Sequence, residues 1–345
     1  MNKLYCLIIS LLICGCTSNT LPRASKSELP CDVTKFDQVF NDVFGSSTDL
    51  VHAMMVVKDG KVIYEKYDTG HDEDELHIMW SVSKTFTATA IGFAQQDGLL
   101  SLDDCILDFF DNEKPLNPSQ WLKQMTIKDL LTMSSGFQDD FIGRSRGDLD
   151  FDWASETLMS PIMFEPGTMF HYNSMDSYLL SVIVSKVTGL KMDEYLAQKL
   201  FRPLGIDRYE WKVSPQGYSA GGWGLYLNLE SMAKMGQFFI NKGTWNGKRL
   251  LDESWFDEAM SVQIKPWQGR MTAEEAEARY KYDEWQQGYG YQMWACTHGA
   301  YRLDGAWGQS VIIVPEKNLV VACQAHNPDG NRFIQSVWNN IYNVL

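Results

Sequence analysis

Apolar residues follow two spacings along the chain, one typical of strands and one typical of helices. Two β-rich runs in "VHAMMVVKDGKVIYEKY" (51–67) meet at Asp59-Gly60, which is a strong hairpin signal. Near the C-terminus, "YGYQMWAC", "AWGQSVIIVP" and "LVVACQA" again have strand character, and a short turn, Glu316-Lys317-Asn318, joins the last two. Between these strand-rich ends the apolar spacing is mainly helical.

The helical spacing predicts a short helix over 32–44, a charged exposed helix or lid over 272–285, and a closing helix over about 331–343. The pattern lacks the βα repeats of a parallel sheet. We therefore predict an α/β (α+β) fold: an antiparallel sheet built from both chain ends, flanked by helices, with a large all-helical insertion. Its helices are predicted over 81–97, 126–133, 174–188, 192–200, 229–242 and 253–261.

The N-terminus has the pattern of a secretory signal, with an early lysine followed by an apolar stretch too short to span a membrane comfortably. Ile13-Cys14-Gly15-Cys16 resembles a bacterial lipobox, which implies cleavage before Cys16 and lipidation of that residue; ordinary cleavage a few residues later is the alternative. Thr17 follows, without the Asp that would argue for inner-membrane retention. We therefore expect an exported lipoprotein that faces the periplasm and is anchored in the outer membrane.

These patterns divide the chain into three parts. Residues 1–15 form the signal peptide, and 16–30, which are polar and rich in Pro and Ser, form a flexible lipid-anchored tether. Residues 31–345 form the folded domain, with a helical part over about 78–285 and the α/β part over about 31–77 and 286–345.

The composition narrows the possible partners. The 345 residues are 45% apolar, which is enough for a large core, and the net charge is −14 with no basic run, so nucleic acid is excluded as a partner. The sequence contains neither C-x-x-C nor H-E-x-x-H, and its six histidines are scattered, so no metal site is predicted.

Four of the seven cysteines lie outside the signal peptide and the lipobox. In an exported protein they permit two disulfides in any of three pairings. Cys296 and Cys323 lie in neighbouring strand-like segments and form one plausible pair, and four buried thiols are the alternative. The four residues are Cys31, Cys105, Cys296 and Cys323.

Two serines lie in G-x-S-x-G, the nucleophile elbow that joins a strand to a helix in α/β-hydrolases. Ser145 has an acidic loop on both sides, and Ser219 is preceded by Pro215 and lies well before the next predicted helix. Neither context fits, and the parallel sheet that an elbow requires is not predicted.

Ser81 and Lys84 form S-x-x-K at the start of a predicted helix. Residues at i and i+3 share a helix face, and backbone N–H groups of a first turn can stabilise an oxyanion. Lys84 can therefore take a proton from a nucleophilic Ser81. Ser83, next to Lys84, faces elsewhere. The alternative is a capping serine with a solvated lysine.

Further segments accompany S-x-x-K in a fixed order: "LHIMWSVSKTFTATAIGFAQQDGLLSLDDCILDFF", "MTIKDLLTMSSGF", "EPGTMFHYNSMDSYLLSVIVSKVTG", "GWGLYLNLESMAKMGQFFINKGTWNGKRLL" and "GAWGQSVIIVPEKNLVVA". Together they resemble the serine hydrolases related to class C β-lactamases and penicillin-binding proteins. The segments "YNSMDSYLLS" and "GAWGQ" look closest to the branch of 6-aminohexanoate-dimer hydrolases and esterases. The resemblance covers about residues 50–340 and implies the β-lactamase/transpeptidase-like fold.

The resemblance implies roles for individual residues. Ser81 is the nucleophile, Lys84 its base, and Tyr172 the tyrosine of Y-x-N, which relays a proton to the leaving group. Ser174 takes the place of the motif's asparagine, and the oxyanion hole is formed by the N–H groups of Ser81 and Ala306.

This sequence departs further from the third motif of the family, K-T-G. Gly305 matches its glycine, but Leu303 stands where β-lactam-recognising relatives have a cation for the substrate carboxylate; Arg302 or Arg144 could take its place. Two tryptophans in glycine-rich segments form either an apolar wall of the cleft or ordinary packing. These are Trp223 and Trp307.

We therefore expect a serine hydrolase that cleaves a small-molecule amide or ester through an acyl-enzyme and needs no cofactor. A β-lactamase or D-amino-acid peptidase of the same superfamily is the alternative. A non-catalytic binding protein on the same scaffold is a third reading. Neither the substrate nor the oligomeric state is predicted.

Overall fold

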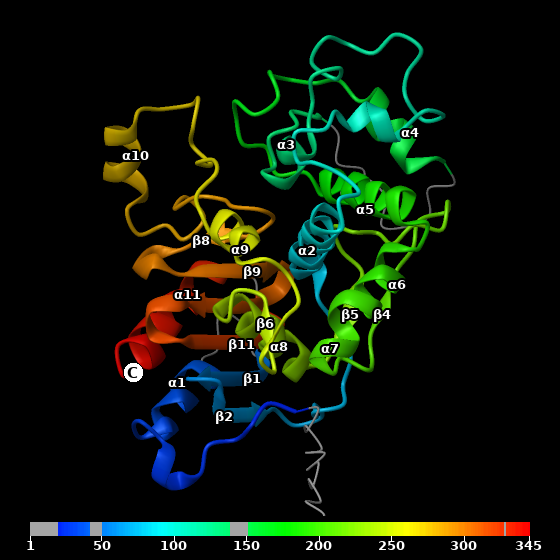
Figure 1. Cartoon of the computed structure of the whole chain (residues 1–345). Coiled ribbons are helices and arrows are strands. Elements are labelled where there is room, and N and C mark those ends of the chain that lie inside the picture. The colour runs from blue at the N-terminus through cyan, green and yellow to red at the C-terminus, as the bar shows by residue number, and fades with distance from the viewer. Residues whose placement is uncertain (1–19, 42–49, 139–150, 328) are drawn as a thin grey trace, which may run out of the picture.

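The computed structural model describes residues 20–41, 50–138, 151–327 and 329–345, and its centre is a six-stranded antiparallel sheet (Figure 1). The sheet joins strands from both chain ends in the order β2-β1-β11-β10-β9-β8, so the predicted fold class is confirmed. The strands are β1 (Val51–Lys58), β2 (Lys61–Tyr67), β8 (Trp294–Ala295), β9 (Tyr301–Gly305), β10 (Gln309–Val314) and β11 (Leu319–Ala325).

Both faces of this sheet are buried by helices. Along β1, Met55 and Val57 pack toward one apolar cluster, whereas Met54 and Val56 pack toward the other. The first cluster includes α2 and α8, and the second includes α1 and α11, which lie side by side in Figure 1. Burial on both faces explains why these strands have almost continuous apolar sequences.

The helices follow the predicted spacing closely, except that the helices over 153–159 and 202–204 were not predicted. Within the described residues the α-helices are α1 (Asp37–Phe40), α2 (Ser83–Gln96), α3 (Ile127–Leu131), α4 (Trp153–Met159), α5 (Ser174–Thr188), α6 (Met192–Leu196), α7 (Arg202–Leu204), α8 (Leu229–Ile240), α9 (Glu253–Ala259), α10 (Ala273–Tyr280) and α11 (Gly330–Val337). None of the helices in this part of the chain is long and apolar enough to cross a membrane.

Two small sheets interrupt the helical part, where only helices and loops were predicted. In the larger, β5 (Leu225–Leu227) lies between β3 (His77–Ile78) and β4 (Glu210–Trp211). The Met79 N–H also donates to the Leu225 carbonyl oxygen at 2.8 Å, which fixes the chain just before Ser81. The smaller pairs β6 (Thr244–Trp245) with β7 (Lys248–Arg249).

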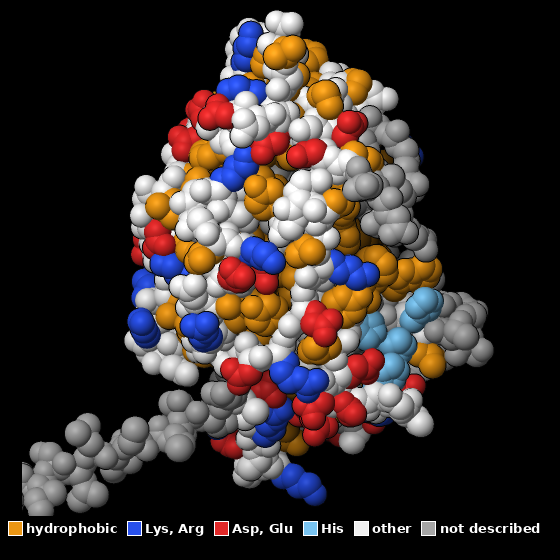
Figure 2. Space-filling view, turned by 90° about the vertical axis from the view of Figure 1, so that its right-hand side faces the viewer, with side chains coloured by type: hydrophobic (Ala, Val, Ile, Leu, Met, Phe, Trp, Pro, Cys, Tyr) orange, Lys and Arg blue, Asp and Glu red, His pale blue; other side chains and the backbone are white. Residues whose placement is uncertain are grey.

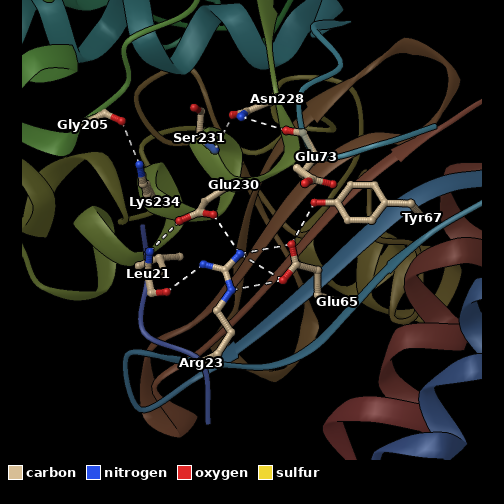
Figure 3. A network of polar contacts seen from close by, with 10 residues as sticks. All are labelled: Leu21, Arg23, Glu65, Tyr67, Glu73, Gly205, Asn228, Glu230, Ser231 and Lys234. Carbon is tan, nitrogen blue, oxygen red and sulfur yellow. Dashed lines mark hydrogen bonds and ion pairs between the residues drawn. The ribbon is translucent and has the colours of Figure 1, made fainter. Parts of the chain in front are cut away.

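The segment over 20–30, predicted to belong to a flexible tether, is held against the sheet (Figure 3). Leu21 is buried, and its N–H donates to Glu230 Oε1 at 2.5 Å. Arg23 lies between Glu230 and Glu65, with its Nη2 2.9 Å and 3.0 Å from their carboxylate oxygens. The backbone of Val62 in β2 pairs with this segment as well. These contacts are long-range, which is why the local composition did not reveal them.

Replacing Arg23 by alanine is expected to lower the free energy of unfolding by about 1 kcal/mol, because two half-buried carboxylates lose a shared partner. Urea unfolding would measure the change. Arg208→Ala is the matched control, because the Arg208–Asp74 pair is largely exposed and is expected to contribute almost nothing. Equal effects of the two substitutions would contradict a stabilising role for the docked segment.

The four cysteines of the folded domain are free thiols, so the suggested Cys296–Cys323 disulfide is wrong. Cys296 follows β8 and Cys323 lies in β11, and these strands are three positions apart in the sheet. Three strand spacings amount to about 14 Å, whereas a disulfide needs Cα atoms within about 7 Å. Cys296 Sγ instead accepts a hydrogen bond from Arg302 Nη1 at 3.2 Å.

Candidate active site

Ser81 lies in a 3₁₀-helix, η3 (Trp80–Val82), that leads directly into α2. Trp80 has a φ of 46°, a left-handed conformation that costs a bulky residue roughly 1–3 kcal/mol. Ser83 stabilises this turn, because its hydroxyl donates to the Trp80 carbonyl oxygen at 2.6 Å and accepts from the Leu225 N–H at 3.2 Å. Ser83 is therefore a structural residue of the turn that presents Ser81.

Lys84 lies one turn further along, at the buried start of α2, with 1% of its surface exposed. Its Nζ donates to Ser81 Oγ at 3.2 Å, to Ser174 Oγ at 3.0 Å and to the Gly222 carbonyl oxygen at 2.7 Å. Only glycine fits at 222, because a Cβ there would lie 2.7 Å from the Ser174 carbonyl oxygen. Lys84 thus places a buried amine in contact with the predicted nucleophile, and the solvated-lysine alternative is excluded.

Tyr172 borders the same centre, with its ring centroid 5.0 Å from Lys84 Nζ. The ring stacks on Trp294 at a centroid distance of 5.8 Å. Asn173, the next residue, caps α5 by accepting from the Met175 N–H at 2.8 Å. Ser174, the first residue of α5, accepts a hydrogen bond from Lys84 Nζ.

Gly305, at the end of β9, lies against the backbone of the Ser81 turn. A Cβ at this position would be 2.3 Å from the Met79 carbonyl oxygen and 3.2 Å from the Ser81 nitrogen. The close approach brings the end of β9, followed by the exposed Ala306, beside Ser81. This arrangement is what an oxyanion hole formed by the N–H groups of Ser81 and Ala306 requires.

A Gly305→Ala substitution is expected to lower kcat/KM by about 100-fold, because the added methyl group must displace either β9 or the Ser81 turn by about 1 Å. The backbone conformation at 305 is ordinary extended, with φ of −136°, so the effect is steric. Ester hydrolysis and thermal melting would be measured together. An unchanged kcat/KM in a folded variant would contradict the predicted oxyanion hole.

Arg302 does not take the place of the missing K-T-G cation. Leu303 is completely buried in the core. Arg302 is also completely buried, and its guanidinium donates to Asp304 Oδ2 at 2.9 Å and to the Glu284 carbonyl oxygen at 2.8 Å. Arg144 lies outside the described residues, as do Ser145 and Cys16.

The two predicted cleft tryptophans differ in their surroundings. Trp223, which follows Gly222, stacks on Trp153 at 5.5 Å and is half-buried, so it has a packing role. Trp307, which follows Ala306, is 43% exposed and stacks on His326 at 4.5 Å. Ser219, the other elbow candidate, is completely buried and donates to Asp193 at 2.7 Å.

Two contributors to the site were not predicted. One is the Gly222 carbonyl oxygen, which accepts from Lys84, and the other is Trp294, on which Tyr172 stacks. The glycine-rich sequence before Trp223 was the available signal for the first. Trp294 lies among many aromatic residues and had no distinguishing signal.

Histidines that are scattered in the sequence gather on one face of the molecule (Figure 2). His52 stacks on His71 at 4.2 Å, and its Nδ1 lies 3.2 Å from His77 Nε2. Desolvation, and then the charges of His71 and His77, lower the pKa of His52 to about 4. In the described residues, no group of three or more His, Cys, Asp or Glu side chains is arranged to hold a metal ion.

This depressed pKa predicts a loss of stability in acid. An unfolded histidine titrates near pH 6.5, so between pH 6.5 and 4 the unfolded chain binds more protons and the free energy of unfolding falls as pH falls. Because His52 is partly solvated, we expect a contribution of about 1 kcal/mol. Urea unfolding at pH 7 and 4.5 should show that His52→Asn loses less stability in acid than the wild-type protein. His298→Asn, which changes a histidine outside the cluster, should lose as much as the wild type. Equal losses in the wild type and both variants would contradict the prediction.

Comparisons with known proteins identify the family and the fold of the chain. A family model described as Beta-lactamase matches residues 48–343. The 6-aminohexanoate-dimer hydrolase of Paenarthrobacter ureafaciens is 23% identical over 297 residues, covering 80% of this chain and 73% of that protein.

Two solved structures share the fold. EstCE1, a hydrolase with promiscuous acyltransferase activity, has a TM-score of 0.72 at 14% identity, covering 90% of this chain and 98% of its own. A family VIII carboxylesterase has a TM-score of 0.69 at 15% identity, covering 89% and 97%. Because the family model spans most of the sequence, the chain belongs to the beta-lactamase family.

Proposed function

We propose that this protein is a serine hydrolase that cleaves an amide or an ester through a covalent acyl-enzyme on Ser81. The observation that carries the proposal is the hydrogen bond from the buried Lys84 ammonium to Ser81 Oγ, with Tyr172 beside it. In the neutral form, Lys84 takes the proton of the Ser81 hydroxyl as its oxygen attacks the substrate carbonyl. The N–H groups of Ser81 and Ala306 then stabilise the oxyanion.

Collapse of the tetrahedral intermediate releases the leaving group. Tyr172 donates a proton to the departing nitrogen or oxygen and is reprotonated through Lys84. Water then attacks the acyl-enzyme by the same proton transfers in reverse, which frees Ser81 and releases the acid.

Esters and linear amides are supported as substrates more than β-lactams. The buried Leu303 occupies the position of the cation that holds a β-lactam carboxylate in relatives, and Arg302 is engaged with Asp304. The names of two similar proteins, a 6-aminohexanoate-dimer hydrolase and a family VIII carboxylesterase, support the same choice.

The test is a fluorophosphonate probe followed by mass spectrometry, then a panel of nitrophenyl esters, linear amides and nitrocefin. We expect an adduct on the peptide that carries Ser81, and turnover of esters or amides above that of nitrocefin. Nitrocefin turnover that exceeds both would favour the β-lactamase alternative. The absence of any adduct and of any turnover would favour a non-catalytic binding protein.

We also propose that the enzyme is exported and anchored by lipid on Cys16, which lies outside the described residues. The lipobox-like sequence supports this proposal. Expression in a Gram-negative host should place the protein in the outer-membrane fraction, and Cys16→Ser should release it from the membrane. Membrane association that is unchanged in Cys16→Ser would contradict the proposal.

A further inference from the structure

Phe170 and Trp294, whose rings contact that of Tyr172, line a cavity of about 200 Å³ with mainly aromatic walls, which we call the aromatic pocket. The segment over 266–286, with α10, forms its outer wall, and Phe170 and Trp294 form its inner wall. Arg270 Nη2 donates to the Phe170 carbonyl oxygen at 3.0 Å and so joins the two walls. The aromatic residues that line it are Phe170, Trp267, Tyr280, Trp285 and Trp294.

The inner wall packs directly against Tyr172 of the candidate active site. Trp294 stacks on Tyr172, and Phe170, two residues before Tyr172, contacts Trp294 at a centroid distance of 5.6 Å. Trp285 is also a wall of a second cavity, of about 110 Å³, which is lined by Gly305 and Ala306. Trp285 therefore links the aromatic pocket to the end of β9.

The aromatic pocket is preformed. Trp285 packs edge-on against Trp294 at 4.8 Å, and the Arg302 guanidinium lies 4.3 Å from its ring centroid. Arg302 is itself buried and paired with Asp304, so its guanidinium holds the Trp285 ring in place. A rigid aromatic cavity binds a planar apolar group without an ordering cost.

From this geometry we propose that the aromatic pocket binds an aromatic ring, or a planar apolar group of that size, on the leaving group of the substrate. The inference rests on the proposed function, because Tyr172 delivers its proton to the leaving atom and that atom must lie beside Tyr172. The leaving group would then contact the inner wall of the aromatic pocket, which is formed by Phe170 and Trp294. The preferred substrates are esters or amides of benzyl-type alcohols or amines.

The experiment compares benzyl acetate with ethyl acetate, two esters with the same acyl group and alkyl-type leaving groups of similar intrinsic reactivity. We expect kcat/KM for benzyl acetate to exceed that for ethyl acetate by about tenfold or more, because only the benzyl ring fills the pocket. Ethyl phenylacetate, which carries the ring on the acyl side, should show no such gain.

Trp267→Ala tests the outer wall, since Trp267 lines the pocket and has no part in the proposed proton transfers. We expect it to lower the benzyl-to-ethyl ratio by about fivefold or more with ethyl acetate turnover nearly unchanged, and Trp267→Phe to restore most of the ratio. Trp121→Ala is the matched control, because Trp121 is a partly exposed tryptophan that does not line the pocket.

Each outcome decides the proposal. Equal kcat/KM values for benzyl and ethyl acetate in the wild-type protein would overturn the aromatic pocket as a leaving-group site while leaving the proposed function intact. So would a Trp267→Ala variant that loses both activities equally, or a gain on ethyl phenylacetate instead. If the wild-type protein hydrolyses no ester or amide and forms no adduct at Ser81, the proposed function falls and this inference falls with it.

Discussion

Replacing Ser81 by alanine is expected to lower kcat/KM for any ester or amide substrate by about 10⁴-fold or more and to abolish labelling by a fluorophosphonate. Without the hydroxyl no acyl-enzyme forms, and only binding and the oxyanion N–H groups remain to accelerate the reaction. The fold should be retained, because Ser81 is half-buried and the turn that carries it is held by Ser83 and Leu225.

Two other serines provide the controls for this prediction. Ser219→Ala removes a buried hydroxyl that donates to Asp193 and should affect stability more than activity. Ser83→Ala removes the support of the Trp80 turn, so a partial loss of activity of about tenfold is expected with labelling of Ser81 retained. Labelling that persists in Ser81→Ala and disappears in Ser219→Ala would refute the assignment of the nucleophile.

The sequence predicted those parts of the fold that depend on local patterns. The β1–β2 hairpin has Asp59 and Gly60 at φ values of 51° and 77°, the left-handed pair that this turn chemistry favours. Helix α5 has the predicted bounds, and α2 begins two residues later than predicted because Trp80–Val82 forms a 3₁₀ turn. The small β3-β5-β4 sheet was missed, since strands of two or three residues give no periodic signal.

The parts of the site that depend on contacts between distant segments of the chain could not be predicted from local sequence patterns. The Ser81–Lys84 contact follows from helix spacing, and the family resemblance, which the family match confirms, pointed to Tyr172 and Ser174. The glycine-rich sequence before Trp223 indicated a close approach of the main chain, but it did not identify the Gly222 carbonyl oxygen as an acceptor for Lys84. The suggested disulfide was wrong because β9 and β10 lie between the two cysteine-bearing segments, both along the chain and in the sheet.

The second large effect is expected at Lys84, where activity and stability should respond differently. Lys84→Met should lower kcat/KM by about 10³-fold or more, because methionine cannot accept the proton of Ser81. Stability should change by no more than about 1–2 kcal/mol. Burying an ammonium group is costly, and a methionine of similar volume removes that cost, which offsets the loss of the hydrogen bonds that Lys84 Nζ donates to Ser174 Oγ and to the Gly222 carbonyl oxygen.

Lys84→Arg separates the proton-transfer role from a purely electrostatic one. Arginine keeps the positive charge but stays protonated, so it can hold the oxygens of Ser81 and Ser174 without serving as a base. We expect Lys84→Arg to be as inactive as Lys84→Met, with slow fluorophosphonate labelling of Ser81 in both. Stopped-flow acylation measured against pH, with thermal melting of each variant, would test this. Activity in Lys84→Arg within about tenfold of the wild-type protein would show that a fixed charge suffices, and the base would then have to be Tyr172.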